Sequence, residues 1–245
     1  MPFENLISQL KEAVGLELEP IALRRVDTPP AGTQIQREEL PSACTFWRKA
    51  EHELFFATKE AHMGCPIGAM VMGFDLPKEK EDELMDLVDA MCSLSYLKEE
   101  EVPNIPKLTD SHSGVLYGPL RAFPMEPELV LLWATPAQAM LLREATGEIA
   151  WSLEAEAGLF GRPACAVLPK SLERGRPTLS MGCTGMRTFT EISEDRMLLS
   201  IPGGLLSTLG EEIQKVVSAN QKLKDLYLQK KSKSKSNRNE NPRSA

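Results

Sequence analysis

The chain has 245 residues, 42% of them hydrophobic and 26% charged, as in a soluble globular protein that can bury a sizeable core. It has no secretory signal and no apolar run near the roughly 18 residues of a membrane span, so we expect a cytoplasmic protein without a membrane span. Residues 229–245 hold six Lys or Arg and one Glu, a charge of +5 within a net charge of −7, which leaves −12 on the other 228 residues. An acidic body argues against nucleic acid as its partner.

Helical periodicity and short apolar runs alternate along the chain. Apolar residues three or four positions apart predict helices, and short apolar runs bounded by Pro or Gly predict strands. The expected helices cover residues 3–14, 43–50, 66–70, 84–91 and 136–147, with a last helix from about 205 to 228 that has a candidate break at Gly210. The expected strands cover residues 21–26, 53–58, 113–120, 129–134, 149–155, 177–181 and 196–201.

The helix after Thr135 has the clearest boundaries. Thr135 is a favourable N-cap, Pro136 suits the first helical position, and Gly147 supplies a C-terminal stop. Flanking strands make this helix the best candidate for a βαβ-type unit.

Strands interleaved with helices predict an α/β or α+β fold with a sheet of mixed direction. No linker divides the body, so we expect one domain over residues 1–228. The Lys- and Ser-rich residues 229–245 are expected to form a disordered basic tail.

The tripeptide Met-Gly-Cys occurs twice, and each copy has a second cysteine upstream. Cys44 lies 21 residues before Cys65, and Cys165 lies 18 residues before Cys183. If the halves arose by duplication, a pseudo-two-fold axis would bring the four sulfurs to one place. Four convergent sulfurs in a reducing compartment indicate a metal or cluster site rather than a disulfide framework.

Cys65 precedes Pro66 at a predicted helix start, where the helix dipole favours the thiolate that binds metals or attacks electrophiles. His62 has a plausible ligand spacing to Cys65, although a single histidine beside a turn is commonly an ordinary hydrogen-bonding residue. Cys92 lies on the apolar face of a predicted helix and is expected to be a core residue.

Cys183 lies in a glycine-rich turn. Gly182 and Gly185 allow the backbone to approach a ligand closely, and the charge of Arg187 would balance a thiolate or a cluster. An ordinary tight turn after a strand explains the same residues, and that alternative stays open. The sequence contains no Cys-x-x-Cys, no phosphate loop, no dinucleotide fingerprint and no Gly-x-Ser-x-Gly.

Several of these segments together resemble a known family. They are Cys44 before an aromatic-rich helix, Cys65 before Gly68-Ala69, the Gly118-Pro119-Leu120 turn, residues 129–140 and residues 180–187. Over residues of about 5–220 the chain resembles the family called domain of unknown function 169. The resemblance implies an intracellular prokaryotic protein with cysteines at the positions of Cys44, Cys65, Cys165 and Cys183, and it implies no established activity. Many relatives carry a further cysteine where this chain has Met186, so one potential ligand is missing here.

We therefore expect a [4Fe–4S] or other iron–sulfur cluster, or alternatively zinc, on Cys44, Cys65, Cys165 and Cys183. Iron would imply a redox or auxiliary role beside an unidentified redox or enzyme partner, and zinc would imply a structural role. The alternative is a small-molecule-binding protein or thiol-dependent enzyme in which Cys65 or Cys183 reacts and Arg187 orients an anionic substrate. A structural or partner-binding protein without such a site also stays open.

Overall fold

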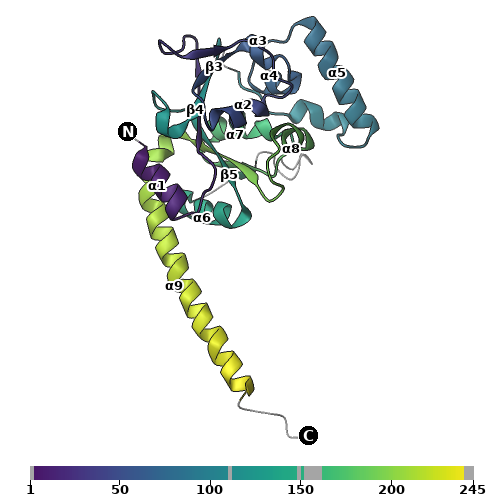
Figure 1. Ribbon diagram of the computed structural model, residues 1–245. Helices are drawn as coiled ribbons and strands as arrows, with labels where there is room; N and C mark the ends of the chain where they lie inside the picture. The colour runs from purple at the N-terminus through teal and green to yellow at the C-terminus, as the bar shows by residue number, and fades with distance from the viewer. Residues whose placement is uncertain (1–2, 110–111, 148–149, 152–161, 240–245) are drawn as a thin grey trace.

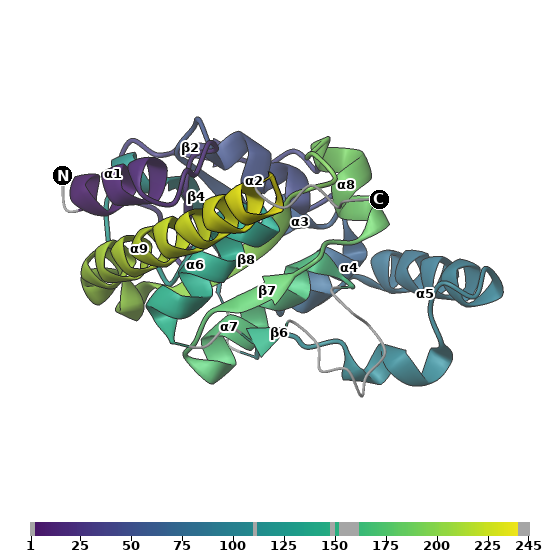
Figure 2. The ribbon, with the colours of Figure 1, turned by 90° about the horizontal axis from the view of Figure 1, so that it is seen from below.

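The computed structural model describes residues 3–109, 112–147, 150–151 and 162–239. An eight-stranded sheet forms the middle layer, and helices cover both of its faces (Figures 1 and 2). The strands are β1 (Ile21–Val26), β2 (Gln34–Gln36), β3 (Phe55–Thr58), β4 (Gly114–Pro119), β5 (Leu129–Ala134), β6 (Ala150–Trp151), β7 (Thr178–Ser180) and β8 (Met197–Pro202). The expectation of an α/β fold with a mixed sheet is confirmed.

The strand order is β2-β3-β4-β1-β5-β8-β7-β6. The two outermost pairs, β2 with β3 and β6 with β7, are parallel, and every other neighbouring pair is antiparallel. The sheet is symmetric about the β1–β5 pair. When β1, β2, β3 and β4 are matched with β5, β6, β7 and β8, each half has the same strand order, counted outward from the centre, and the same pairing directions. An internal duplication would produce this correspondence, and the duplication itself stays a hypothesis.

The helices are α1 (Glu4–Glu12), α2 (Cys44–Ala50), α3 (Lys59–His62), α4 (Pro66–Val71), α5 (Lys78–Ser93), α6 (Pro136–Thr146), α7 (Val167–Arg174), α8 (Thr184–Thr190) and α9 (Leu206–Asn239). Short 3-10 turns lie at η1 (Glu99–Asn104), η2 (Leu120–Ala122), η4 (Ala164–Ala166) and η5 (Gly203–Leu205). Because strand residues alternate between faces, two separate cores form. One lies between the sheet and α2, α4 and α7, and the other lies under α1, α6 and α9.

Local sequence signals explain α6 well. The side chain of Thr135 accepts a hydrogen bond from the backbone N–H of Gln138, and the Gln138 side chain accepts one from the N–H of Thr135, which completes a capping box. Gly147 ends the helix with a φ of 79°. The strands on either side, β5 and β6, run parallel but are separated by β8 and β7. The expected βαβ-type unit therefore joins two parallel strands that are not neighbours in the sheet.

The predicted elements are compared with the structure at three further places. Residues 164–168, which lie outside the predicted elements, form η4 and the start of α7. The predicted strand at 149–155 corresponds to β6, and its residues other than 150–151 lie outside the described residues. Helix α9 continues through Gly210 without the expected break. A β-carbon at Gly210 would meet Oε1 of Gln9, the end of a flexible side chain on α1.

The basic tail also differs from expectation over part of its length. Helix α9 extends through Asn239 and projects away from the body (Figure 1), so residues 229–239 are helical, and residues 240–245 lie outside the described residues. No Gly or Pro interrupts residues 211–241, and Lys and Gln propagate helices well. None of the helices in the described part of the chain has both the length and the apolar composition of a membrane-crossing segment.

Removal of residues 229–245 should leave the free energy of unfolding within about 0.5 kcal/mol, because the described side chains beyond Leu228 are exposed. By contrast, Ile213→Ala in the same helix should cost about 2–5 kcal/mol, because Ile213 is buried. Urea unfolding of the two variants measures both effects. A truncation as costly as Ile213→Ala would show that the tail packs on the body.

Candidate functional site

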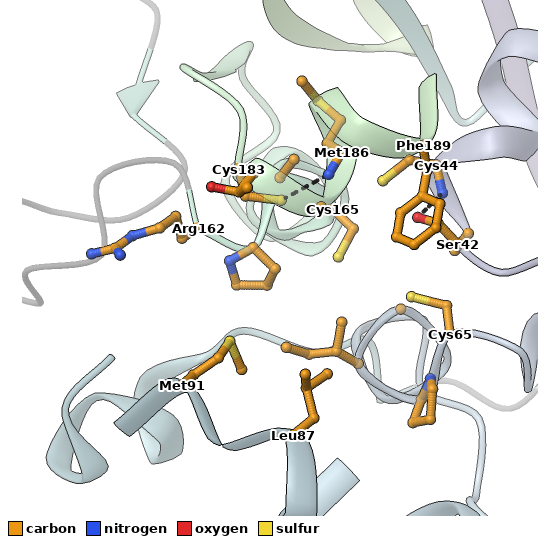
Figure 3. A pocket seen from close by; sticks show the side chains of 18 of the residues that line it. Ser42, Cys44, Cys65, Leu87, Met91, Arg162, Cys165, Cys183, Met186 and Phe189 are labelled. Carbon is orange, nitrogen blue, oxygen red and sulfur yellow. Dashed lines mark hydrogen bonds between the residues drawn. The ribbon is translucent and has the colours of Figure 1, made fainter. Parts of the chain in front are cut away.

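The structure brings four cysteines from four distant segments to one cavity. Cys44 is the first residue of α2, Cys65 is the N-cap of α4, Cys165 lies in η4 before α7, and Cys183 is the N-cap of α8. All four line one cavity of about 780 Å³. Figure 3 shows their side chains around this space. Their arrangement follows the strand correspondence, since Cys44 and Cys65 flank β3 and Cys165 and Cys183 flank β7.

The four thiols differ in burial. Cys44 and Cys165 are 6% and 5% exposed, whereas Cys65 and Cys183 are partly exposed, and none of the four is in a disulfide. Burial raises the pKa of Cys44 well above its usual value, and the charges of Cys183 and Cys65 raise it further. The pKa of Cys165 is raised in the same way, first by burial and then by Cys44, Cys65 and Cys183. The two buried thiols therefore stay protonated at neutral pH unless a cation compensates their charge.

The two Met-Gly-Cys turns need a glycine for different reasons, one steric and one conformational. A β-carbon at Gly64 would lie 2.3 Å from the carbonyl oxygen of Leu40. Gly182 has a φ of +87°, a conformation that side chains disfavour, and a β-carbon there would also meet Met186. Each glycine thus allows the turn that places the following cysteine at the start of a helix.

Neighbouring groups shape the space around the sulfurs. The backbone N–H of Met186 donates to Sγ of Cys183 at 3.4 Å. A β-carbon at Gly68 would come within 3.1 Å of Sγ of Cys65, so this glycine leaves room for the sulfur. Met186 itself is buried and lines the cavity, so a thioether stands where relatives are expected to carry a thiol.

The sulfurs surround a space and do not meet at a point. Across the described ranges, which include all five cysteines, no group of three or more His, Cys, Asp or Glu is arranged to hold a single metal ion. To be held by all four thiols, a thiophilic group would have to be larger than one ion, or the four segments would have to move closer together.

The three further residues that the sequence singled out have different positions. Gly185 lines the cavity, whereas Gly182 and Arg187 are not among the described residues that line it. The guanidinium of Arg187 donates to the backbone oxygens of Met181, Ser193 and Arg196 at 2.6–3.2 Å. Arg187 therefore fixes the turn around Cys183 and does not face the four sulfurs.

His62 is a structural residue. It is completely buried, with Nδ1 2.8 Å from the carbonyl oxygen of Thr58 and Nε2 3.2 Å from the hydroxyl of Tyr117. Since a carbonyl only accepts, Nδ1 carries the proton and Nε2 accepts from Tyr117. Both ring nitrogens are used, which leaves neither for a metal.

One wall of the cavity was missed by the sequence analysis. It comes from α5 and the segment after it, through Leu87, Met91, Leu94, Leu97 and Ile105. The only available signal was an α5 helix with more apolar residues than one buried stripe needs, such as Met85 and Leu87, which are 54% and 44% exposed. Cys92 packs against the core beside this wall and does not line the cavity in the part of the chain that the structure describes.

Burial lowers the pKa of His62 from 6.5 to about 4. Between pH 6.5 and 4, the histidine is protonated in the unfolded chain but neutral in the folded protein. The free energy of unfolding is therefore highest above pH 6.5 and decreases as the pH falls towards 4, by at most about 1.4 kcal/mol per pH unit. Urea unfolding at a series of pH values should show this loss, and His62→Gln should flatten it. The exposed His52 provides the control, since His52→Gln should keep the wild-type slope. An unchanged slope in His62→Gln would contradict the assignment.

Comparisons with known proteins agree with the expected resemblance. The profile of the DUF169 family, described as uncharacterised ArCR, matches residues 9–212, which include all four cavity cysteines. No curated protein and no solved structure matches the chain. The chain belongs to the DUF169 family.

Proposed function

We propose that Cys44, Cys65, Cys165 and Cys183 bind an iron–sulfur cluster in the cavity that they line. The observation that carries the proposal is the convergence of four thiols, from segments spread over residues 44–183, on one largely apolar cavity. Thiolates are the usual ligands of such clusters. The cytoplasm, the location that we propose, would keep the thiols reduced and available.

The absence of a compact ligand group among the described residues argues against a single zinc ion more strongly than against a cluster. Zinc holds four sulfurs at about 2.3 Å each, which needs the ligands close together. Among the described residues no such compact group exists, yet all four cysteines are near enough for charge on one to affect the pKa of another. A cluster is bound through several separate irons, so its cysteines stand farther apart.

The raised pKa values of Cys44 and Cys165 have a consequence for assembly. Both thiols must lose a proton to become ligands, and burial opposes this in the apoprotein. A cationic cluster core would supply the missing compensation and release protons on binding. Loading should therefore become more favourable as the pH rises.

An iron–sulfur cluster here would act in electron transfer or as an auxiliary group of an enzyme partner. Hydrogen bonds to sulfur and burial set cluster potentials, and the N–H of Met186 on Cys183 Sγ is one such bond. The partly exposed Cys65 and Cys183 mark the side of the cluster from which a partner would exchange electrons.

A second candidate is a thiol-dependent enzyme, which the cavity volume and the exposure of Cys65 and Cys183 favour. A reactive thiolate would then attack a small electrophile bound in the cavity. Arg187 is a weak candidate for orienting an anionic substrate there, since its guanidinium donates to three backbone carbonyls.

Protein produced and purified without oxygen, or reconstituted with iron and sulfide, should be brown and contain about four irons and four sulfides per chain. Serine at Cys65 or Cys183, the partly exposed ligands, should lower the iron content by more than half without unfolding the protein. Cys92→Ser is the matched control and should keep wild-type iron, because Cys92 does not line the cavity. Metal and acid-labile sulfide analysis with visible absorbance measures each result.

Colourless protein with one tightly bound zinc per chain would contradict the cluster and show that the cysteines hold a structural metal. Protein without metal, in which neutral iodoacetamide labels Cys65 or Cys183 much faster than Cys92, would support the thiol enzyme instead. Loss of iron in Cys92→Ser, with the fold intact by circular dichroism, would contradict the assignment of the ligands.

A further inference from the structure

The cavity is larger and more apolar than its thiols require. We use the name α5 wall for Leu87, Met91, Leu94, Leu97 and Ile105, which line the cavity. The α5 wall belongs to the long segment between α4 and β4. Figure 3 shows Leu87 and Met91 across the open space from Cys165 and Cys183.

Much of this apolar surface is not used for core packing. In α5, which the structure describes along its whole length, only Val88 is buried. Leu87 is 44% exposed and Leu94 is 78% exposed, although both line the cavity. Phe189, on α8, adds a side chain that is 45% exposed. Apolar surface of this kind, gathered on the walls of a cavity, is typical of a ligand site.

The cavity lining also contains a positively charged side chain. Among the described residues that line the cavity, Arg162 is the one cationic side chain, and Glu83 is the one carboxylate. The Arg162 guanidinium stacks on the ring of Tyr96 at 4.4 Å and donates to the backbone oxygen of Tyr96. Since a guanidinium has five N–H donors, this pairing leaves donors for a ligand. Figure 3 places Arg162 at the end of the cavity away from Cys44 and Phe189, with its guanidinium directed away from the four sulfurs.

We propose that this cavity binds a small organic acid with an apolar body. Its carboxylate pairs with Arg162 at the rim of the cavity, and its apolar body extends inward between Leu87, Met91 and Phe189, in front of the thiols. The volume of about 780 Å³ lies within the range of roughly 300–1,000 Å³ for small-molecule sites. An Arg–carboxylate pair fixes the orientation of the acid, and the apolar contacts supply most of the affinity.

The acid would share the cavity with the proposed cluster but would contact other residues, and it has its own test. The α5 wall and Arg162 contribute no thiol, so the inference holds whether or not the cysteines bind a cluster. A free molecule fits better than a membrane surface, because the body is acidic and the cavity lining offers a single cation.

Octanoate and 1-octanol, which share a chain length and differ in charge, are suitable probes for calorimetric titration of the full chain. Octanoate should bind more tightly than octanol, and Arg162→Gln should weaken octanoate about ten-fold and leave octanol unchanged. Leu87→Asp should weaken both probes at least ten-fold, because it places a carboxylate in the apolar part of the cavity. Met85→Asp is the matched control, since Met85 is exposed on the same helix outside the cavity, and it should change affinity less than about two-fold.

Several results would overturn the inference. They are no detectable octanoate binding by the wild type, an equal loss in Leu87→Asp and Met85→Asp, and an equal effect of Arg162→Gln on octanoate and octanol. The iron content of the same variants separates this inference from the cluster proposal. Octanoate binding by iron-free protein would leave the acid site standing and the cluster proposal without support. Brown, iron-containing protein that does not bind octanoate would support the cluster proposal and contradict the acid site.

Discussion

The antiparallel pairing of β1 with β5 holds the two halves of the molecule together. Ile21 lies opposite Leu131, and Leu23 lies opposite Leu129, and all four are completely or almost completely buried. Because paired residues of antiparallel strands face the same side, these four side chains belong to the core that also supports the cysteine-bearing helices. A register shift of one residue would turn them to the opposite face. The distance between the cysteines of one half and those of the other depends on this pair of strands.

A buried polar contact fixes the position of α2 across the same junction. Nε1 of Trp133 on β5 donates to Oε1 of Glu51 at 3.0 Å, and Glu51, which caps the end of α2, also pairs with Arg48. Burial raises the pKa of Glu51, which the charge of Arg48 and these hydrogen bonds partly oppose. The rings of Trp47 and Trp133 pack 6.2 Å apart beside this contact. Because α2 begins at Cys44, the contact that anchors its far end also sets the place of that sulfur.

The parts of the fold that could be predicted from sequence are those with local causes. The cap at Thr135, the stop at Gly147 and the helix start at Pro66 each depend on a few adjacent residues. The continuity of α9 through Gly210 could not be predicted, because a single glycine in a helical pattern can either end a helix or lie within it. The position of Arg187 was missed for a different reason, since its three carbonyl partners come together only in the folded turn.

The candidate site shows the same division. The repeated Met-Gly-Cys indicated which thiols belong together, and the strand correspondence gives a structural reason why a short tripeptide carried that information. The α5 wall has no comparable motif, only an excess of apolar residues in α5. Apolar residues at helical spacing predict a buried face, and only the tertiary structure shows that Leu87 faces a cavity and not a core.

The two halves contribute unequally to that cavity. In the second half, residues 191–196 alone separate α8 from β8, whereas in the first half residues 72–113, with α5 and η1, separate α4 from β4. The thiols therefore come from equivalent places in the two halves, while the α5 wall comes from one half only. A group bound by the thiols alone would require no such wall. The asymmetry thus supports the proposed apolar ligand, whose contacts would come from the segment that only one half possesses.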